Sequence, residues 1–380
     1  MHKVVVIGGG VVGMSAAYRL LRHGVRVVVV DRADEGKATA AGAGILSPGN
    51  RFPPNDSILP FLKQAHAYYP ELIANLAEDG EYHTGYEKVG AVHVAITDEE
   101  AVQIPKLLEQ VQQRRLDGFH HIGDAKIIDA DAAKSFFPAL SPVKAAIHIP
   151  EAARVDSRLL CSSLKRAVRR RGADLFHDHT NLVVNEGKVT NVTVGSQTIS
   201  ADAVIVAAGA WSSKLAKQIG ITVSVYPQRG QIAHLVVPHT KTAGWSIVIS
   251  LTHYILTFPP NRVVVGATRE DVGYDYRVTI GGMQEIIHEG LRMAVGLESA
   301  TFQEIRIGFR PQSLDAKPLI GQVPGIQNVY FATGHGGYGL QVGLFSGAII
   351  ADLVLYKWVS IDLNPFAVGR FDRDYNQTSK

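Results

Sequence analysis

Cysteine is almost absent from the 380-residue chain, in which Cys161 is the only one. A single thiol excludes an intrachain disulfide and a thiolate cluster for a metal, so we expect no metal site and a cytoplasmic protein. The net charge is also small, at +3, because the chain has 38 lysines and arginines and 35 acidic residues. So small an excess argues against nucleic acid as a partner.

The sequence has few long hydrophobic runs, and we expect none that spans a bilayer. The apolar start leads into a patterned helix with no small-residue cleavage site, so we expect no secretory signal. Internal repeats and low-complexity segments are missing as well. The length and the hydrophobic content of 46% predict one or two domains with a large buried core.

The first thirty residues predict a strand, a helix and a second strand. A β-branched run over residues 4–7 is typical of a parallel strand buried on both faces. Apolar residues recur at helical spacing over residues 12–23, and Gly24 is placed to end that helix. Residues 25–30 form another apolar run, and Asp31 closes it.

Three glycines stand in the turn before this helix, in the pattern Gly8-x-Gly10-x-x-Gly13. Gly8 permits a tight turn, Gly10 lets a pyrophosphate approach the backbone, and Gly13 lets the helix pack close to the strand. The helix N-terminus offers N–H groups to the phosphates. Asp31 is placed to accept hydrogen bonds from a ribose diol and disfavours a 2′-phosphate. The pattern predicts FAD or NAD; the alternative, a glycine-rich structural turn, leaves Asp31 unexplained.

Three later segments extend this pattern, and the first of them indicates close approach of the backbone to a large flat ligand. Residues 38–50 are too rich in small residues for an ordinary amphipathic helix, although a flexible surface loop is the alternative. A buried strand at 203–207 leads into Ala-Gly-Ala-Trp-Ser. A strand at 329–332 leads into a glycine-rich turn at 334–339 and a helix from about Leu340.

These stretches resemble the D-amino-acid oxidase superfamily of flavoproteins, which includes glycine oxidase, bacterial D-amino-acid dehydrogenases and sarcosine oxidase. The matching segments run almost end to end: VVVIGGGVVG with Asp31, ATAAGAGIL, ARVDSRLL, VIVAAGAWS, RVVVGAT, GFRPQSLDAKPLIG, FATGHGGYGL and the tail NPFAVGRFD. Glycine oxidase is the nearest likeness. The resemblance implies FAD, which we expect to be non-covalent because Cys161 is far in sequence from the loops at the flavin ring.

The resemblance implies an α/β fold in which a Rossmann-like FAD-binding domain is interleaved with an α+β substrate domain built on a large antiparallel sheet. The FAD-binding domain would comprise residues 1–87, 148–225 and 312–380, and the substrate domain residues 88–147 and 226–311. The residue pattern agrees with a second domain of this kind, because several segments are predicted to be strands outside any βαβ unit. They are 88–96, 231–237, a hairpin over 246–268 that turns at 259–261, and a meander over 181–201.

The family also implies which residues contact FAD. They are Gly8, Gly10, Val11, Val12, Gly13, Asp31, Arg32, Thr39, Ala40, Gly44, Ile45, Val184, Ala208, Gly209, Trp211, Gly334, His335, Gly336, Gly337, Tyr338, Gly339 and Leu340. The helix that begins near Leu340 would stabilise the negative charge that the flavin gains on reduction. His335 is interpreted as positioning this loop. Glycine oxidase carries an arginine where this chain has Gly337, which indicates a different or roomier pocket.

An enzyme of this group must hold the substrate α-carbon near flavin N5 and fix the substrate carboxylate, a task that calls for a guanidinium. Arg310 stands at the position of the family's carboxylate-binding arginine; a surface arginine at a strand end is the alternative. Tyr254 matches a tyrosine that meets the carboxylate in glycine oxidase, or packs as a core aromatic. Tyr338 and Gln341 are placed to line the pocket. Arg269 is interpreted as a surface residue, or as a cation that assists reaction with oxygen.

We therefore expect FAD-dependent oxidative deamination of a small amino acid: glycine, a D-amino acid, or an N-alkyl or cyclic amino acid. Hydride would pass from the α-carbon to flavin N5, and the imine would be hydrolysed to the 2-oxo acid. Oxygen or a quinone would accept the electrons, so oxidase and dehydrogenase stay open. A 2-hydroxy-acid oxidoreductase and a non-catalytic subunit are the alternatives. The sequence is compatible with a homo-oligomer. The basic run at 165–171 is interpreted as a solvated helix face or as a peripheral membrane contact.

Overall fold

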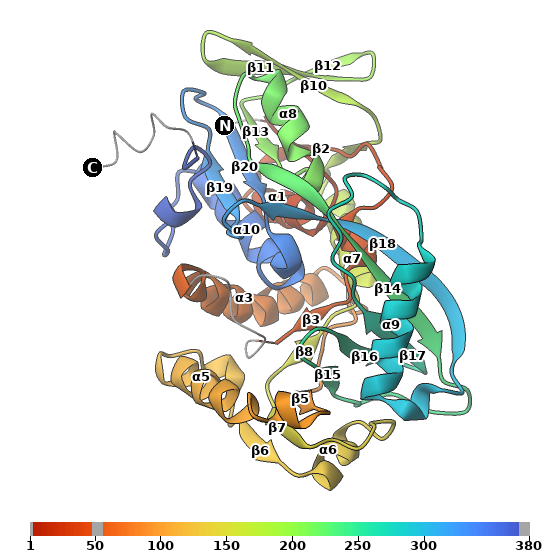
Figure 1. The fold of residues 1–380 in the computed structure, drawn as a ribbon. Coiled ribbons are helices and arrows are strands. Elements are labelled where there is room, and N and C mark those ends of the chain that lie inside the picture. Colours follow the sequence, from red (N-terminus) through yellow and green to blue (C-terminus); the bar gives the residue numbers. More distant parts are fainter. Residues whose placement is uncertain (1–2, 48–55, 372–380) are drawn as a thin grey trace.

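The computed structural model of the protein describes residues 3–47 and 56–371. Two large sheets organise these residues, one in the upper and one in the lower half of Figure 1. Two long strands, β14 (Val225–Val236) and β18 (Thr301–Ser313), belong to the lower sheet and run along one another up to the upper one. The site described below lies where the two halves meet.

The upper sheet has six strands in the order β19-β20-β13-β1-β2-β9, all parallel except β19. The strands are β1 (Lys3–Ile7), β2 (Arg26–Val30), β9 (Asp174–Phe176), β13 (Ala203–Val206), β19 (Leu319–Gln322) and β20 (Val329–Thr333). Successive side chains of a strand point to opposite faces, so Val4 and Val6 join one core cluster while Val5 and Ile7 join another. Both faces are therefore covered, as the apolar runs predicted.

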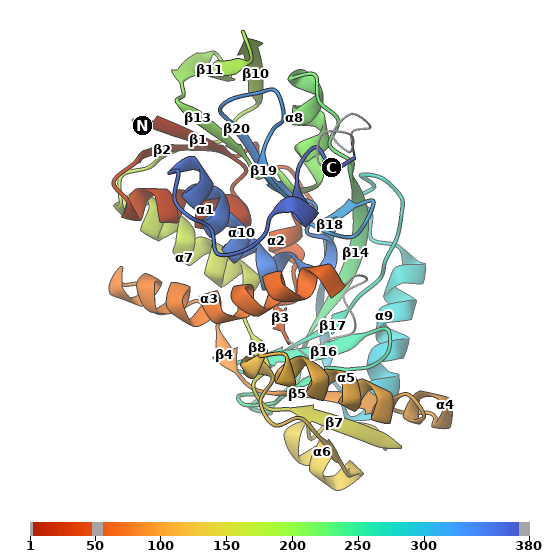
Figure 2. The same cartoon turned by 90° about the vertical axis from the view of Figure 1, so that its left-hand side faces the viewer.

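Helices cover one face of this sheet and a small sheet covers the other. The helices are α1 (Val11–Arg22), α7 (Ser157–Arg170), α10 (Gly339–Val354) and, below them in Figure 2, α3 (Leu59–Glu78). The small sheet is the predicted meander, with β10 (Thr180–Asn185), β11 (Lys188–Val194) and β12 (Gln197–Ser200). It packs with α8 (Ser212–Gln218), and turns at 186–187 and 195–196 connect its strands.

The lower sheet has eight strands in the order β18-β14-β17-β16-β15-β5-β7-β6. Besides β14 and β18 they are β5 (Ala91–Ala95), β6 (Lys126–Ile128), β7 (Ala145–Ile149), β15 (Ile247–Ile249), β16 (Tyr254–Phe258) and β17 (Arg262–Gly266). All neighbours are antiparallel except β5 and β15. Helices α9 (Ile280–Met293) and α6 (Ala130–Phe136) pack on one face, and α5 (Ile104–Leu116) packs near the other.

Short elements complete the described chain. They are α2 (Ala38–Ala41), α4 (Asp98–Ala101), a three-stranded sheet of β3 (Ile45–Leu46), β8 (Ala153–Arg154) and β4 (Glu87–Lys88), and the 3₁₀ turns at Asp56–Ile58, His120–Ile122, Gly209–Trp211, Val295–Leu297, Gly336–Tyr338 and Asn364–Phe366. The predicted small-residue segment at 38–50 becomes α2 and β3, and its last residues lie outside the described ones.

Three expectations about strands need correction. The strand expected over 88–96 is two strands, because Gly90 adopts a φ of +70° between β4 and β5. The hairpin expected over 246–268 holds a third strand, β15. Its parallel partner β5 makes the large sheet mixed rather than wholly antiparallel. The domain limits stay a prediction. Strand β7 continues past the proposed limit at residue 148, and all of its residues pair with β5 in the lower sheet.

One segment is long and apolar enough to cross a membrane by length and composition, contrary to expectation. It is Gly336–Val354, in which α10 makes up most of the length. In the structure this segment is a core helix, because α10 packs between α1 and α3 and its residues are largely buried.

The basic run at 165–171 is not simply a solvated face. Arg166 and Arg170 both pair with Glu81, whose side chain is only 4% exposed, and Arg171 pairs with Asp79 at 2.6 Å. These pairs tie the end of α7 to the end of α3. Burial raises the pKa of Glu81, but the hydrogen bonds and charges of Arg166 and Arg170 together outweigh burial and hold that pKa below its ordinary value.

Because the pKa of Glu81 is lowered on folding, its ionised form stabilises the fold above the unfolded pKa of about 4.5. We expect Glu81→Gln to lower the melting temperature at pH 7. The gap to the unaltered protein should close as pH falls below about 4.5, since the carboxylate then takes up a proton. Thermal unfolding between pH 7 and acid measures this, with Glu78→Gln, an exposed residue at the end of α3, as control. A gap that does not change with pH would contradict the assignment.

Candidate functional site

A cavity of about 770 Å³ lies between the two sheets. One end is formed by the carboxyl ends of β1, β2 and β13, where ligands of parallel α/β sheets bind. The other end is formed by β16, β18 and the segment that follows β17. The glycine-rich turn at 336–339 lies between them, so residues from the whole length of the chain meet around one space.

The glycine turn after β1 has the predicted geometry. Gly8 adopts a φ of +114°, and a Cβ on it would lie 2.2 Å from the carbonyl oxygen of Ala207. A Cβ on Gly13 would lie 1.9 Å from the carbonyl oxygen of Gly8, so only glycine lets α1 pack this close. Gly10 is the N-cap of α1 and forms no side-chain cap hydrogen bond. The turn therefore presents open backbone and a helix N-terminus to the cavity, which suits a pyrophosphate.

Asp31 follows β2 and lines the same end of the cavity. Its Oδ2 lies 2.8 Å from Nζ of Lys37, and its Oδ1 accepts the N–H of Ala33 at 3.1 Å. Burial raises the pKa of Asp31, but the hydrogen bond and charge of Lys37, together with the hydrogen bond from the N–H of Ala33, outweigh burial and keep that pKa below its ordinary value. The carboxylate is thus an ionised acceptor, as binding of a ribose diol requires. Gly9 lies against it, since a Cβ there would be 2.3 Å from Oδ2.

The middle of the cavity is lined by the turn before α10. Nε2 of His335 lies 2.9 Å from Oγ of Ser346, about two turns inside that helix, and burial lowers the pKa of His335 to about 4. A neutral, buried histidine tied to its own helix supports the positioning role rather than a catalytic one. Gln341 is held by His66 at 3.1 Å. Cys161 contacts Gly9 at 3.5 Å, at the opposite end from this turn.

Arg310 lies on β18 at the far end of the cavity. Its Nη1 donates to the carbonyl oxygens of Thr268, at 3.0 Å, and of Arg229, at 3.3 Å. Among the described residues no carboxylate pairs with it. Burial lowers the pKa of Arg310, yet a guanidinium stays charged at neutral pH. Because only backbone carbonyls hold Arg310, its positive charge is not neutralised by a carboxylate and can bind an anionic ligand. The alternative prediction, a surface arginine, is wrong.

Tyr254 opens β16 directly opposite Gly266 on β17. A Cβ at Gly266 would lie 2.6 Å from the Tyr254 hydroxyl, so the glycine makes room for the phenol. Burial raises the pKa of Tyr254, which therefore remains a neutral hydrogen-bond donor. Tyr254 and Arg310 line the same cavity, so the structure brings both predicted substrate residues together. Gly230 has a similar role under Arg310, because a Cβ on it would lie 2.5 Å from Nη2.

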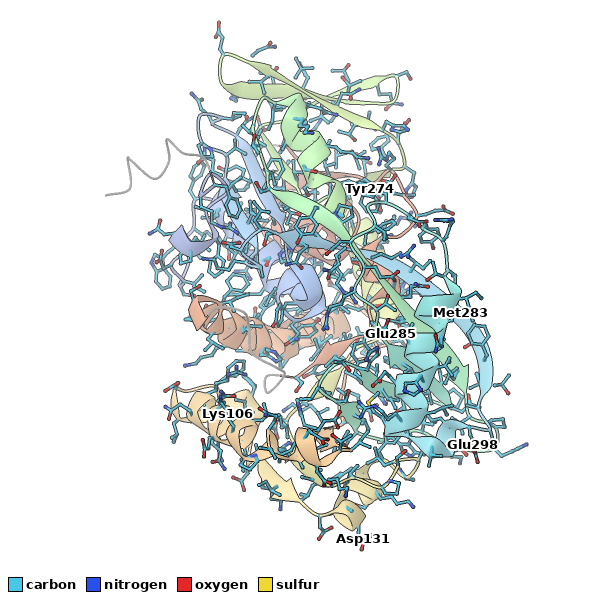
Figure 3. All side chains as sticks on the ribbon, viewed as in Figure 1. Lys106, Asp131, Tyr274, Met283, Glu285 and Glu298 are labelled. Atoms are coloured by element: carbon cyan, nitrogen blue, oxygen red, sulfur yellow. The ribbon has the colours of Figure 1, made fainter. Side chains whose placement is uncertain are left out.

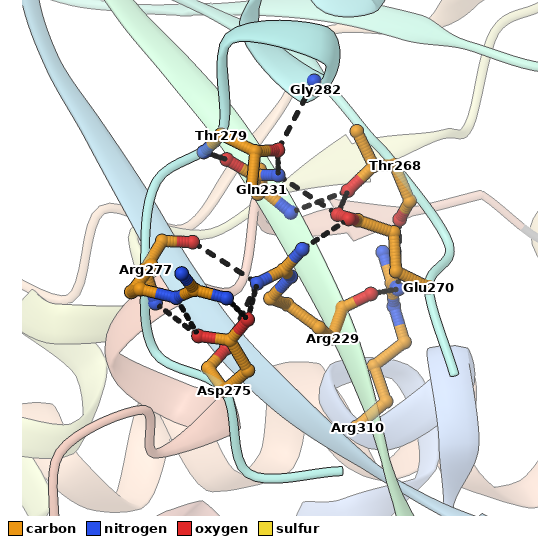
Figure 4. Close-up of polar contacts among 9 residues, drawn as sticks. All are labelled: Arg229, Gln231, Thr268, Glu270, Asp275, Arg277, Thr279, Gly282 and Arg310. Atoms are coloured by element: carbon orange, nitrogen blue, oxygen red, sulfur yellow. Dashed lines mark hydrogen bonds and ion pairs between the residues drawn. The ribbon is translucent and has the colours of Figure 1, made fainter. Parts of the chain in front are cut away.

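A polar network supports the two carbonyls that hold Arg310, and sequence reasoning missed it (Figure 4). Glu270 pairs with the buried Arg229 and accepts from Gln231 at 2.9 Å and from Thr268 at 2.6 Å. Arg229 also lies 3.1 Å from a carboxylate oxygen of Asp275. The members come from β14 and from the segment after β17, so only the folded chain brings them together. No local sequence signal marks the network, because β14 also holds Gln228, Gln231 and His234.

Aromatic rings close the cavity beside this network. Tyr274, labelled in Figure 3, stacks on Trp211 with ring centroids 5.5 Å apart, and its hydroxyl donates to the carbonyl oxygen of Ala210 at 2.7 Å. His253 was also missed; it lines the cavity, and its Nε2 lies 3.2 Å from Glu285 on α9, which Figure 3 labels as well. Tyr274 thus attaches the segment between β17 and α9 to Ala210 in the upper half, and Asp275 attaches it to Arg229 on β14.

Most residues predicted to contact a cofactor line the cavity, and four do not. Gly13 acts through helix packing, as described. Gly334, with a φ of +74°, shapes the turn, where a Cβ would lie 2.6 Å from Leu319. Ala40 is exposed on α2. Val184 lies on β10 and packs against the core cluster of the small sheet, so its side chain is used there.

The comparisons with known proteins agree with this geometry. The family described as "FAD dependent oxidoreductase" (DAO) matches residues 3–353. An uncharacterized oxidoreductase of Bacillus subtilis, YurR, is 40% identical over 96% of this chain and 98% of its own length. The glycine oxidase of Geobacillus kaustophilus is 28% identical, and 97% of each chain is covered.

Solved structures show the same fold. The iminodiacetate oxidase of Chelativorans sp. BNC1 superposes with a TM-score of 0.92 at 38% identity, covering 96% of this chain and 98% of the other. The glycine oxidase of Geobacillus kaustophilus superposes with a TM-score of 0.86 at 27% identity, covering 97% and 99%. With a dinucleotide cradle of the expected geometry and a family match over nearly its whole length, the chain is a member of the DAO family of FAD-dependent oxidoreductases.

Proposed function

We propose that this oxidoreductase oxidises a small amino acid at the carbon that bears the amine, and that the imine formed is hydrolysed to a 2-oxo acid. The observation that carries the proposal is the placement of Arg310. It is a guanidinium held by backbone carbonyls, without a carboxylate partner among the described residues, in the same cavity as the dinucleotide cradle. Such a group binds a carboxylate in two-point contact.

The residues of the cradle fit FAD. The N-terminus of α1 would hold the pyrophosphate, Asp31 the ribose, and the turn before α10 the flavin ring. When bound, FAD supplies a two-electron acceptor for the reaction. In this arrangement the carboxylate binds Arg310 and accepts a hydrogen bond from the Tyr254 hydroxyl. The two contacts orient the amine-bearing carbon toward the ring.

The relatives support an α-amino carboxylate as the substrate class. By their names, two of them act on glycine and on iminodiacetate, which share a carboxylate one carbon from an amine. Either oxygen or a quinone would serve as acceptor. A cytoplasmic location and a homo-oligomer stay predictions.

Anaerobic mixing of the purified holoprotein with amino acids tests the proposal. The panel is glycine, sarcosine, iminodiacetate, D-alanine, D-proline, D-aspartate and the L-forms of the chiral members. Loss of the oxidised-flavin absorption with at least one amine is expected. Admission of air then separates an oxidase, which recovers quickly with peroxide, from a dehydrogenase, which recovers slowly. No bleaching by any amine, but bleaching by a 2-hydroxy acid, would overturn the substrate class.

Gly9 offers a separate test of the cradle. A methyl group at Gly9 would collide with the Asp31 carboxylate, so we expect Gly9→Ala to displace that acid and weaken FAD binding by at least about tenfold. Equilibrium dialysis, or flavin content after gel filtration, measures the loss. Gly281→Ala is the matched control, because a Cβ there has open space. Full flavin retention in Gly9→Ala would place the ribose elsewhere.

A further inference from the structure

The charges that line the cavity are divided between its two ends. The carboxylates among the described lining residues are Asp31, Asp34 and Asp178, all at the dinucleotide end. Asp31 pairs with Lys37 there, and Asp34 with Arg32. At the far end Arg269 and Arg310 line the cavity, and no described lining residue there is acidic. The substrate end therefore has two guanidinium groups and no negative charge of its own.

The backbone around Arg269 directs its side chain toward the cavity. Glu270 exchanges both backbone hydrogen bonds with Arg229, at 2.9 and 3.0 Å, so the segment is extended like a strand. The side chains of Thr268 and Glu270 contact each other at 2.6 Å within the polar network. Because side chains alternate along an extended segment, Arg269 points away from that network, and it lines the cavity.

Arg269 also lies close to Arg310. The carbonyl oxygen of Thr268, in the peptide that joins Thr268 to Arg269, accepts the Nη1 of Arg310 at 3.0 Å. No carboxylate lies within ion-pair distance of Arg269 in the part of the chain that the structure describes, because Glu270 is held by Arg229, Gln231 and Thr268. Two neighbouring cations repel each other, and one substrate carboxylate compensates only one of them.

We propose that Arg269 binds a second carboxylate, and that the preferred substrate is an amino diacid, with one carboxylate on Arg310 and the other on Arg269. This inference rests on the proposed function and narrows it to a substrate class. The second carboxylate is carried either by a substituent on the amine or by the side chain. In both cases it is a few bonds from the carbon that is oxidised, as the closeness of the two arginines requires.

Matched substrate pairs test the proposal in the holoprotein. Iminodiacetate differs from N-ethylglycine, and D-aspartate from D-2-aminobutyrate, by a carboxylate in place of a methyl group. We expect one diacid to give a kcat/KM about 10- to 100-fold above that of its partner, since hydrogen bonds to charged groups give factors of this size. Which diacid wins shows whether the second carboxylate is on nitrogen or on the side chain. The preference should weaken as salt is added, because Arg269 is exposed.

Substitution of Arg269 assigns the preference to that residue. Arg269→Gln should remove most of the advantage of the diacid and leave kcat/KM for the matched monoacid within about threefold. Arg269→Lys should retain part of the advantage, since the charge remains. Lys126→Gln, an exposed residue on β6, is the control for loss of one positive charge. Flavin content and melting temperature confirm that each variant is folded.

The outcomes separate the two proposals. Bleaching by monoacids with no gain for either diacid would overturn the role of Arg269 and leave the amino-acid oxidoreductase standing. An equal loss for both members of a pair in Arg269→Gln would also overturn it, because a second-carboxylate contact cannot weaken a monoacid. Bleaching by no amine at all would instead refute the proposed function.

Discussion

Replacement of Arg310 by leucine is expected to raise KM for the amino-acid substrate at least about 100-fold while FAD stays bound. The guanidinium lies at the substrate end of the cavity, and its loss leaves the carboxylate that it would bind without a charged donor, since Arg269 is proposed to bind a different carboxylate. Arg310→Lys should recover part of the affinity, because it restores the charge but not the two-point geometry. Steady-state kinetics and the flavin spectrum of each variant measure both effects.

A matched control for this substitution lies on the same strand. Arg306 is four residues from Arg310 on β18, pairs with Glu304 and is not among the residues that line the cavity. Arg306→Leu should therefore leave KM nearly unchanged. If Arg310→Leu shows the kinetics of the unaltered enzyme, Arg310 does not bind the substrate and another cation must.

The second large effect is expected at Arg229. Its side chain is 3% exposed and pairs with Glu270 and Asp275, so Arg229→Met would leave Glu270 partly buried without its counter-charge. Breaking such a pair costs about 3–5 kcal/mol in free energy of unfolding. The backbone carbonyl of Arg229 would shift with the network, so KM should rise as well. Denaturant unfolding and kinetics on the same preparation measure the two consequences.

A nearby arginine serves as the comparison for Arg229. Arg277 also pairs with Asp275, but its side chain is 83% exposed, so Arg277→Met should change stability little. A second variant, Arg229→Met combined with Glu270→Leu, removes both buried charges and should be less destabilised than Arg229→Met alone. If the double variant is destabilised by the sum of the two single losses, the pair is not coupled as the structure indicates.

The cofactor cradle could be predicted from sequence because its parts are adjacent in the chain. A strand, three glycines, a helix and Asp31 follow one another within about thirty residues, and each residue type has a local geometric reason. The single cysteine also argued against an intrachain disulfide and a thiolate cluster for a metal, and the small net charge argued against nucleic acid as a partner. Arg310 and Tyr254 were found by resemblance alone, since nothing local distinguishes them from other strand residues.

The surroundings of the substrate end could not be predicted, because they depend on contacts between distant segments. In the sequence, Gly230 and Gly266 look like ordinary strand glycines. In the structure, the side chains of Arg310 and Tyr254 occupy the space that a Cβ on each glycine would take. The pairing of Arg229 with Glu270 joins residues 41 positions apart. The cofactor contact of Val184 stays a prediction, although its side chain packs against the core of the small sheet and does not line the cavity.

The contact between α1 and α10 has a consequence for how such enzymes diversify. A Cβ on Gly347 would lie 2.4 Å from the carbonyl oxygen of Val12, and Oγ of Ser15 donates to the carbonyl oxygen of Leu344 at 2.6 Å. The two helices are thus locked together, and both begin at the cavity. These contacts are made by residues of α1 and α10 alone and use no residue of β16 or β18. Mutations in β16 and β18 can therefore change which molecule is oxidised, while the packing of α1 on α10 and the placement of their N-termini at the cavity stay the same.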